Sequence, residues 1–384
     1  MGREATRRAG ESQKRGGHGV FPVRCGGRVI PSRRFRAVKI LLVKLGHLGD
    51  TLLLTPTLRF LRQKFPDARL NVMVRSGCEV VLRGNPDVSN LLPVGSPEKA
   101  NRSFGKELRE STAAFRVIAS GGRYDYAFDL SDSDRAKFWV ALSRAHVRGF
   151  NDFPPLAGWR RKIFTRFTRF EWPHEHQVLR DFRTVADVIE PAAQPGPMCF
   201  VPQVDVTALK AKLPVADGTH AFAVIHPTSR WAFKQWVPER WSAVADALAQ
   251  RGLKVVFSCG PAARETELVN NILAAARERH ISTDGQLSLH ELGWLLGRTR
   301  LFLGVDTVAM HLAAAMQAPT LALFGPSSEW SWHPWQCRHE LVLGDCPCKA
   351  RRVFECDKSK PYPCMERVTV EAVLAGADKL LASP

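Results

Sequence analysis

The feature that most constrains the fold is a rhythm of short apolar runs, tight turns and helical spacing that passes through the chain twice. The first pass predicts a buried strand at 38–43, a helix at 51–64 and a second strand at 69–74. A further strand is expected at 126–130. Strands that alternate with helices are typical of a parallel sheet covered by helices. We therefore expect an α/β fold.

The rhythm restarts after a stretch rich in proline, PAAQPGP at 191–197, which we interpret as a linker. The second pass predicts strands at 221–225, 253–258, 301–305 and 321–324, and helices at 238–251, 262–279 and 308–317. A length of 384 residues also favours two domains. We place a basic arm at 1–36, a first domain at 37–193, a second at 194–367 and a terminal helix at 368–384. Ligands should bind at the carboxyl ends of the strands, in a cleft between the two domains.

The charge of the chain points to an anionic partner. The formal net charge is +18, and residues 1–39 carry 11 Lys or Arg against two Glu. The arm lacks periodicity, so we expect it to be disordered. Nucleic acid, phospholipid headgroups and a phosphorylated substrate all fit such a charge. A nucleic-acid-binding protein is the main alternative, but the chain has no zinc-finger, RNP or helix-turn-helix signature.

The sequence indicates a cytoplasmic protein. No run is apolar enough to cross a membrane, and the N-terminus has no continuous apolar stretch of a secretory signal. Nine cysteines in 384 residues do not form a disulfide-rich scaffold. We expect a reduced, cytosolic chain.

Three loops at predicted strand ends carry residues suited to chemistry. The first, KLGHLGDT at 44–51, places Asp50 at the start of a helix, where it is either a general base or a helix cap. It matches neither a dinucleotide fingerprint nor a P-loop. The second, HPTSRWAFKQW at 226–236, offers hydroxyls, loop N–H groups and cations to a phosphate. The third, GVDTVAMHLAAA at 304–315, opens a helix of small residues, with His311 one turn beyond Thr307.

In this order and spacing, the three segments resemble the glycosyltransferase family that contains the lipopolysaccharide heptosyltransferases. The resemblance covers residues 36–381. It implies a GT-B fold, with two Rossmann-like domains that face a central cleft. It also implies an ADP-heptose donor, a lipid-linked phosphorylated oligosaccharide acceptor and inverting transfer. No cofactor and no essential metal are expected.

The resemblance also implies roles for individual residues. Asp50 would be the catalytic base. The donor would be bound by Thr228, Ser229, Lys234, Glu265, Asp306, Thr307 and His311. Glu267 is an alternative to Glu265 at the ribose. The acceptor would contact Gly49, Ser131 and Arg135. A different sugar or acceptor remains open, because the sequence does not fix it.

Three further features remain ambiguous. Asp132-Ser133-Asp134 is a DxD triplet, which some transferases use to hold a metal, but it lies in the half assigned to the acceptor. The stretch WRRKIFTRFTRF at 159–170 is either a membrane-binding surface or an ordinary amphipathic helix. Cys346, Cys348, Cys356 and Cys364 either bind a metal or pin a loop. With the basic arm, the aromatic stretch predicts a peripheral enzyme at the inner face of the inner membrane, bound to its anionic surface, and no nucleic-acid partner.

Overall fold

The structure is a computed structural model that describes residues 36–95, 104–153, 155, 156, 158–171, 174–345 and 364–382. Contacts divide the chain between Arg36 and Ala37, and every element described below belongs to the second unit, 37–384. The predicted arm, apart from Arg36, lies outside the described residues, as do Cys346, Cys348 and Cys356. Among the described residues, no helix has both the length and the apolar character needed to cross a membrane.

The first half of this unit is built on a six-stranded sheet, in the order β3-β2-β1-β4-β5-β6, in which every pair is parallel. Its strands are β1 (Lys39–Lys44), β2 (Arg69–Arg75), β3 (Asn90–Val94), β4 (Tyr126–Asp129), β5 (Val147–Asn151) and β6 (Arg166–Thr168). The strand order reverses between β1 and β4, the neighbours whose registers pair Val43 with Asp129.

The second half repeats this plan with a six-stranded sheet in the order β12-β11-β10-β7-β8-β9, again with parallel pairs throughout. Its strands are β7 (Phe222–His226), β8 (Lys254–Phe257), β9 (Ile281–Ser282), β10 (Leu301–Val305), β11 (Thr320–Phe324) and β12 (His339–Leu343). Here the reversal falls between β7 and β10, where Gly304 pairs with His226.

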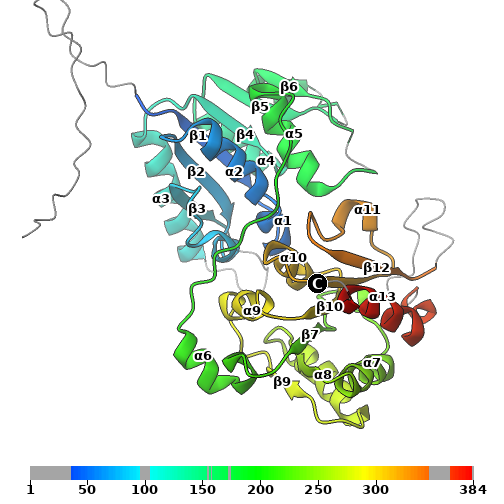
Figure 1. The fold of residues 1–384 in the computed structure, drawn as a ribbon. Helices are drawn as coiled ribbons and strands as arrows, with labels where there is room; N and C mark the ends of the chain where they lie inside the picture. The colour runs from blue at the N-terminus through cyan, green and yellow to red at the C-terminus, as the bar shows by residue number, and fades with distance from the viewer. Residues whose placement is uncertain are drawn as a thin grey trace, which may run out of the picture. The chain divides into compact units, whose positions relative to one another are not determined.

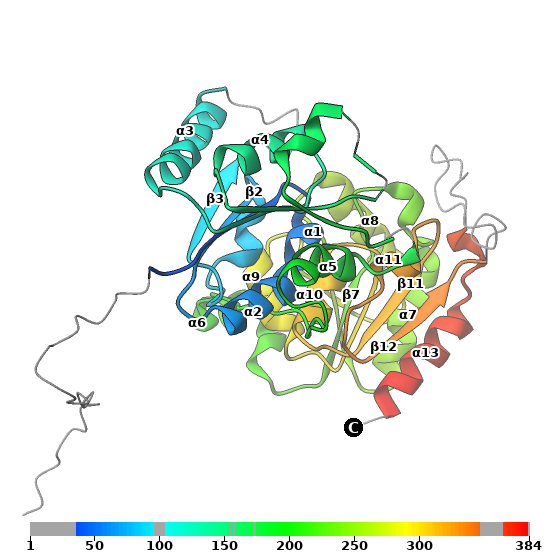
Figure 2. The ribbon, with the colours of Figure 1, turned by 90° about the horizontal axis from the view of Figure 1, so that it is seen from above.

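Helices connect most strands of each sheet (Figures 1 and 2). In the first half these are α1 (Leu48–Leu52), α2 (Thr55–Lys64), α3 (Phe104–Ser120), α4 (Asp134–Leu142) and α5 (Gln177–Ile189). In the second half they are α6 (Val206–Lys212), α7 (Pro238–Gln250), α8 (Ala263–Ala275), α9 (Leu289–Leu296), α10 (Val308–Ala315), α11 (Glu329–Trp332) and α13 (Val370–Ala382). Of these, α5, α6 and α13 lie before or after the strands of a sheet in the chain. The α/β fold predicted from the sequence is confirmed.

Alternate side chains of each sheet pack into different cores, as expected of strands that are covered on both faces. Ile40 and Leu42 of β1 join a large cluster with α2 and α5, whereas Leu41 and Val43 pack with α3 and α4. The large cluster also contains one face of the second sheet together with α9 and α10. The other face packs on α7, α8 and α13. The two halves therefore share one apolar core.

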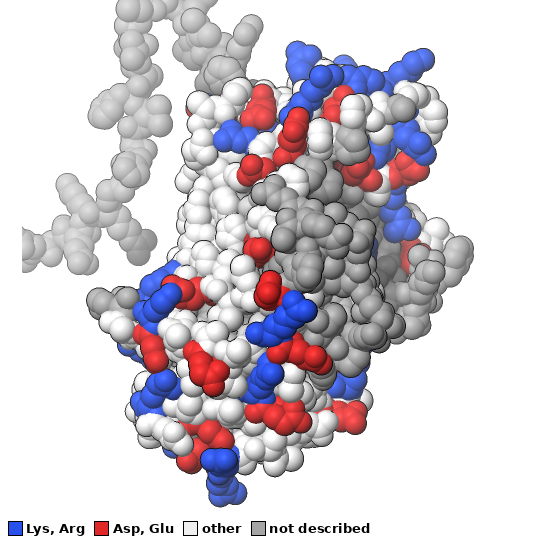
Figure 3. Space-filling view, turned by 90° about the vertical axis from the view of Figure 1, so that its right-hand side faces the viewer, with Lys and Arg blue, Asp and Glu red and all other residues white. Residues whose placement is uncertain are grey.

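Two predicted helices are wrong in detail. The single helix expected at 51–64 is two helices, α1 and α2, because the chain turns at Leu53 and Leu54 and Pro56 lies in the first turn of α2. The stretch 159–170 is not an amphipathic helix. It forms a 3-10 helix, Gly158–Ile163, and then β6, because the main chain pairs with β5 at the edge of the sheet. Figure 3 shows basic side chains at the upper end of the drawn face, where Figure 1 places β5 and β6.

Candidate active site

The predicted site residues fall in the loops at the two points where strand order reverses. In open parallel sheets such a switch point forms a crevice at the carboxyl ends of the strands, and ligands bind there. In the first sheet, Asp50 follows β1, and Ser131 and Arg135 follow β4. In the second sheet the loop after β7 carries Thr228, Ser229 and Lys234, and the loop after β10 carries Asp306 and Thr307 and leads into α10, which carries His311.

Asp50 is the third residue of α1, and its side chain turns back on the loop before the helix. Its Oδ2 accepts a hydrogen bond of 2.8 Å from the His47 N–H. The residue at the N-cap is His47, and Asp50 is the N3 residue of a capping box, so Asp50 does cap the helix, although not from the N-cap position. A carboxylate in the first turn is stabilised by the free N–H groups and the dipole of the helix. No hydrogen bond to Asp50 Oδ1 is found among the described residues, which leaves this oxygen for a substrate.

Gly49 brings the loop of Asp50 into contact with the second half. A Cβ added to Gly49 would lie 3.3 Å from His311 Cδ2, so α1 and α10 approach each other closely there. Burial lowers the pKa of His311, although the carboxylates of Asp306 and Asp50 act in the opposite direction. The imidazole is therefore neutral at pH 7. The two switch points meet at this contact.

Ser131 holds the loop that carries Asp50. Its Oγ accepts a hydrogen bond from the Leu45 N–H at 2.5 Å and donates one to the Val43 carbonyl oxygen at 3.1 Å. Asp129 fixes Ser131 in turn, since its Oδ1 accepts from the Ser131 N–H at 2.9 Å. Burial raises the pKa of Asp129 to about 6, although the hydrogen bond from the Ser131 N–H lowers it. The Ser131 hydroxyl thus positions the loop after β1. Its expected contact with an acceptor stays a prediction.

The other acceptor candidate, Arg135, is an exposed residue in the first turn of α4. Its guanidinium lies against Gly95, directly after β3, so it reaches across the carboxyl edge of the sheet.

The residues of the DxD triplet have structural partners. Lys137 Nζ lies 2.8 Å from Asp132 Oδ1, and Arg160 Nε lies 2.9 Å from Asp134 Oδ1. Ser133 caps α4 by accepting a hydrogen bond from the Ala136 N–H. In the part of the chain that the structure describes, no three His, Cys, Asp or Glu side chains are grouped to hold a metal ion. The triplet therefore organises the start of α4.

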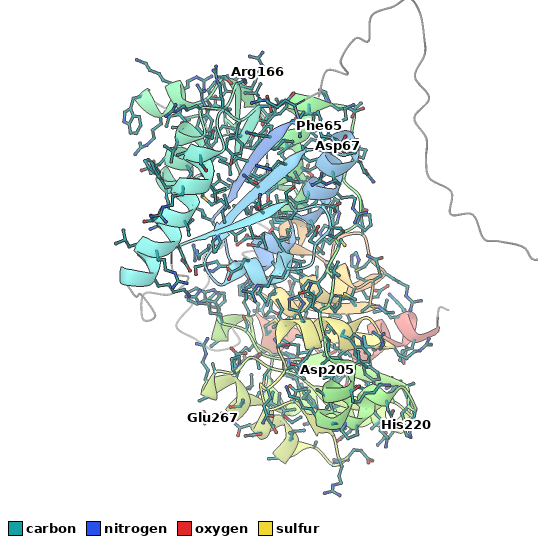
Figure 4. All side chains as sticks on the ribbon, turned by 90° about the vertical axis from the view of Figure 1, so that its left-hand side faces the viewer. Phe65, Asp67, Arg166, Asp205, His220 and Glu267 are labelled. Carbon is teal, nitrogen blue, oxygen red and sulfur yellow. The ribbon has the colours of Figure 1, made fainter. Side chains whose placement is uncertain are left out.

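A buried network joins the loop after β7 to the start of α8. The Thr228 hydroxyl donates to Glu265 Oε2 at 2.7 Å, and the Gly260 N–H donates to the same oxygen at 2.9 Å. Glu267 is exposed and lies at the outer edge of the second half (Figure 4). Of the two glutamates considered, Glu265 is the one that the structure places in this loop cluster, with Oε1 left for a ligand.

Lys234 and Asp306 connect the two loops of the second switch point. Lys234 Nζ lies 2.6 Å from Asp306 Oδ2, and Asp306 is largely buried. The loop of Lys234 is held by Ser229, whose Oγ accepts from the Trp231 N–H and whose carbonyl oxygen accepts from Gln235 Nε2. A cation held by one carboxylate can transfer to a more highly charged anion, so the pair is suited to phosphate binding.

Several buried polar atoms at this end of the second sheet have no hydrogen-bond partner among the described residues, and three of them lie in or beside the predicted donor site. These three are Thr307 Oγ1, His311 Nδ1 and Ser327 Oγ. Thr307 and His311 lie one turn apart at the start of α10, and Ser327 follows β11, the neighbour of β10. Because a buried polar group without a partner costs free energy, such a set is typical of a site that a ligand completes.

The sequence analysis missed the polar groups that support these loops. Lys44 Nζ lies 2.6 Å from Asp181 Oδ2, and both side chains are buried, so α5 is tied to the end of β1. His226 lies between Ser258 Oγ, 3.0 Å from its Nδ1, and Thr228 Oγ1, 3.3 Å from its Nε2. Burial lowers the pKa of His226 to about 4, which keeps the ring neutral. Lys44 and His226 could have been found from the sequence, because each is a polar residue at the carboxyl end of an otherwise apolar strand, and ligands bind at that end.

Comparisons with known proteins find heptosyltransferases and a glycosyl transferase family 9 protein among the proteins similar to this chain. The lipopolysaccharide heptosyltransferase 3 of Escherichia coli is 28% identical to this chain over 87% of the chain and 97% of that protein. The crystal structure of a glycosyl transferase family 9 protein from Veillonella parvula aligns with a TM-score of 0.75 and 20% identity, covering 90% of this chain and 98% of the other. The E. coli heptosyltransferase WaaC with ADP aligns with a TM-score of 0.69 and 18% identity, covering 89% and 100%.

The family follows from a match to a family model that covers more than half of the chain. Residues 116–361 match the family model described as glycosyltransferase family 9 (heptosyltransferase). This segment contains the loops after β4, β7 and β10, and hence three of the four loops of the two switch points. The neighbouring solved structures have the GT-B fold, which agrees with the paired parallel sheets described above. The chain therefore belongs to glycosyltransferase family 9, the heptosyltransferase family, and is an enzyme of that family.

Proposed function

We propose that this enzyme transfers a heptose from ADP-L-glycero-D-manno-heptose to the lipopolysaccharide inner core, with inversion, as a heptosyltransferase of type III that adds the branch heptose. The family and the relative named lipopolysaccharide heptosyltransferase 3 support the sugar and the acceptor. The fold shared with a heptosyltransferase bound to ADP supports the nucleotide. The observation that carries the proposal is the meeting of the two switch points, where Gly49 of the Asp50 loop contacts His311.

The donor is proposed to bind at the second switch point. Lys234 exchanges Asp306 for the diphosphate, because two phosphate groups offer it more negative charge than one carboxylate. Thr228 and Ser229 hold the loop around the phosphates, and Glu265 Oε1 accepts a hydrogen bond from a ribose hydroxyl. The donor's sugar and phosphate region satisfies Thr307 Oγ1 and His311 Nδ1.

Asp50 is proposed to act on the acceptor. The acceptor hydroxyl loses its proton to Asp50 as its oxygen bonds to the anomeric carbon from the side opposite ADP. The bond from that carbon to the phosphate oxygen breaks, and ADP leaves with the electron pair. Lys234 and the N–H groups at the start of α10 stabilise the charge that develops on ADP.

No metal ion is required in this scheme, because Lys234 supplies the positive charge that a divalent cation would otherwise provide. A chelator tests this directly: turnover in excess EDTA should equal turnover in magnesium. A loss that magnesium restores would show that a metal carries the diphosphate charge.

The acceptor is proposed to be a phosphorylated, lipid-linked oligosaccharide that approaches the loops after β1 and β4, where Gly49, Ser131 and Arg135 lie. Such an acceptor is amphiphilic, so we place the enzyme in the cytoplasm, bound peripherally to the anionic inner face of the inner membrane. Each Lys or Arg near an anionic surface contributes about 1 kcal/mol, and the contribution is screened by salt.

The decisive experiment is calorimetry with ADP, UDP and GDP, followed by turnover of ADP-heptose on truncated lipopolysaccharide acceptors. We expect selective ADP binding and transfer of heptose to an inner-core acceptor that lacks the branch heptose. Preference for UDP or GDP would overturn the donor assignment. ADP binding without transfer to any inner-core acceptor would indicate a family transferase with another acceptor.

A further inference from the structure

Apolar side chains are exposed along one side of the first half, on α3 and α4. Leu108 and Phe115 of α3 are 56% and 47% exposed, and Phe138 of α4 is 56% exposed. Leu108 and Phe115 are seven residues apart, so they lie on one face of α3. Both helices run along the upper edge of Figure 2. Large apolar side chains gathered in this way are typical of an interaction surface.

Two neighbouring cavities continue this surface between the helices. One has a volume of about 390 Å³, the other has about 660 Å³, and Phe115 lines both of them. The smaller one also contacts Phe138, and the larger one extends past the end of α4 to Lys162 and Ile163. We call the exposed apolar residues and these two cavities the α3–α4 surface.

The charged side chains that line the two cavities are all basic. No carboxylate lines either cavity, whereas the larger one is lined by Arg123, Arg144, Arg148 and Lys162. Arg144 and Lys162 are exposed, and in the described part of the chain neither forms an ion pair. Arg148 donates to the carbonyl oxygens of Ile163 and Ala145, which leaves its positive charge unneutralised.

We propose that the α3–α4 surface docks on a phospholipid bilayer with anionic headgroups. Phe115, Phe138 and Leu108 enter the boundary between headgroups and acyl chains, and Arg144 and Lys162 contact the lipid phosphates. Protruding apolar side chains bordered by long basic ones are suited to that boundary, because the apolar groups contact acyl chains while the basic groups contact headgroup phosphates. A free phosphate would leave the exposed phenyl groups in water. This inference rests on the proposed function, since an amphiphilic acceptor requires the enzyme to meet a membrane.

The inference also extends the expected membrane contact beyond the stretch 159–170. Of the stretch 159–170, only Lys162 and Ile163 line the larger cavity. Phe164 is buried, and the guanidinium of Arg161 stacks on Phe167 with 4.0 Å to the ring centre. The stretch therefore contributes an edge of the α3–α4 surface through Lys162 and Ile163, while its Trp159, 68% exposed, lines neither cavity.

The test uses the full chain with vesicles that contain one-quarter phosphatidylglycerol, and with neutral phosphatidylcholine vesicles for comparison. Two double variants are made, Phe115→Ser with Phe138→Ser and Arg144→Glu with Lys162→Glu. The control is Leu343→Ser, an apolar residue of β12 that is 44% exposed. Arg135 is left unaltered because it is an acceptor candidate. Cosedimentation at low and at high salt gives the partition coefficient, and ADP release with a soluble acceptor gives the turnover.

We expect each double variant to lower partitioning onto anionic vesicles at least tenfold, while the control changes it less than twofold. High salt should remove the effect of the charge variant, and turnover on the soluble acceptor should stay unchanged. Equal binding to neutral vesicles, or no binding to either kind, would overturn the inference. Anionic binding that survives both double variants would overturn it too and would assign the contact to another part of the chain. Loss of turnover with binding intact would contradict the proposed function and leave the surface standing.

Discussion

The two halves have the same sheet topology but opposite chemistry at their switch points. Each has six parallel strands in the same order, with the reversal between its first and fourth strands. The first switch point presents a carboxylate, Asp50, on a short helix. The second presents a cation, Lys234, with Asp306 as its partner. A shared topology therefore places a loop, and the loop sequence decides which charged group it presents.

The halves differ also in how the side chains of their switch-point loops are hydrogen-bonded, although the buried Asp129 Oδ2 of the first half has no hydrogen-bond partner among the described residues either. At the first switch point, Ser131 uses its hydroxyl twice and Asp129 accepts from the loop that follows it. At the second, Thr307, His311 and Ser327 each have a buried polar atom without a partner in the described chain. A base must be held before substrate arrives, whereas a binding site keeps its hydrogen bonds for the ligand.

The largest effect is expected at the carboxylate of the first half. Asp50→Asn should lower turnover by about 10²-fold or more, because general-base catalysis is lost, while ADP affinity stays unchanged. Steady-state kinetics and ADP calorimetry on the folded variant measure both. Asp67→Asn, an exposed residue between α2 and β2, is the control. Near-normal turnover of Asp50→Asn would show that the carboxylate of the first half is not the catalytic base.

The cation of the second half should show the reverse pattern. Lys234→Ala should weaken ADP binding by about 10- to 100-fold, since a charge-assisted hydrogen bond contributes roughly 1.5–3 kcal/mol. Transfer should slow as well, because the leaving diphosphate loses its counter-charge. Calorimetry with ADP measures the affinity, and Lys210→Ala on α6 provides a matched exposed lysine. Unchanged affinity together with unchanged turnover would show that Lys234 faces solvent in the working enzyme.

Acid should weaken the polar contact between the halves. His176 Nδ1 accepts from the Val178 N–H, and its Nε2 lies 2.9 Å from the His333 carbonyl oxygen, so the ring must be neutral and protonated at Nε2. Burial, followed by the nearby His333, lowers the pKa of His176 to about 3. A lowered histidine pKa stabilises the fold above about pH 6.5, and this stability is lost as the pH falls toward 3.

At pH 5 the lowered pKa of His176 should reduce the free energy of unfolding by about 2 kcal/mol relative to pH 7, which is roughly 30-fold in the folding equilibrium. Thermal unfolding at pH 7 and pH 5 measures it. His176→Asn should be less stable than the wild type at pH 7 and should lose less stability on acidification, whereas His220→Gln, an exposed histidine, should follow the wild type. An identical acid response in His176→Asn and the wild type would contradict the assignment.

The smallest effect concerns the hydrogen bonds that hold the Asp50 loop. Ser131→Ala should lower kcat by about fivefold to tenfold, as expected for a hydrogen bond of roughly 1 kcal/mol, with the KM for the donor unchanged. Ser131→Thr retains the hydroxyl and should restore part of the rate. Ser133→Ala, two residues away, removes only the cap of α4 and serves as the control. A higher donor KM with normal kcat would show that Ser131 does not act through Asp50.

The sequence was informative where function depends on local chemistry. Glycine, aspartate and small residues directly after buried strands predicted the loops after β1, β7 and β10, because a parallel sheet exposes its strand ends at one edge. Contacts across long separations could not be read in this way. Ser131 and Leu45 are 86 residues apart, and no periodicity or motif pairs them. Lys44 and Asp181 are a similar case, since a buried ion pair leaves no local pattern.

Edge strands were the second source of error. The spacing of Phe164, Phe167 and Phe170 suggested a helix, but this segment completes the sheet as β6, where Phe167 pairs with Phe150. Only three residues of β6 join the ladder, too few to show the alternation that identifies a strand.

The shared apolar core limits how enzymes of this architecture can be recombined. Phe200, beyond the linker, lies against Gly293 of α9, where a Cβ would meet its ring, and both Phe200 and Leu312 of α10 belong to the same core cluster as Leu42 and Phe182 of the first half. A chimera cut at the linker and given the donor half of a relative would therefore join two unmatched core surfaces. To change the donor preference by such grafting, the residues that line the junction should therefore be transferred together with the second half. Packing in the shared core also means that a substitution in one half constrains which substitutions the other half accepts.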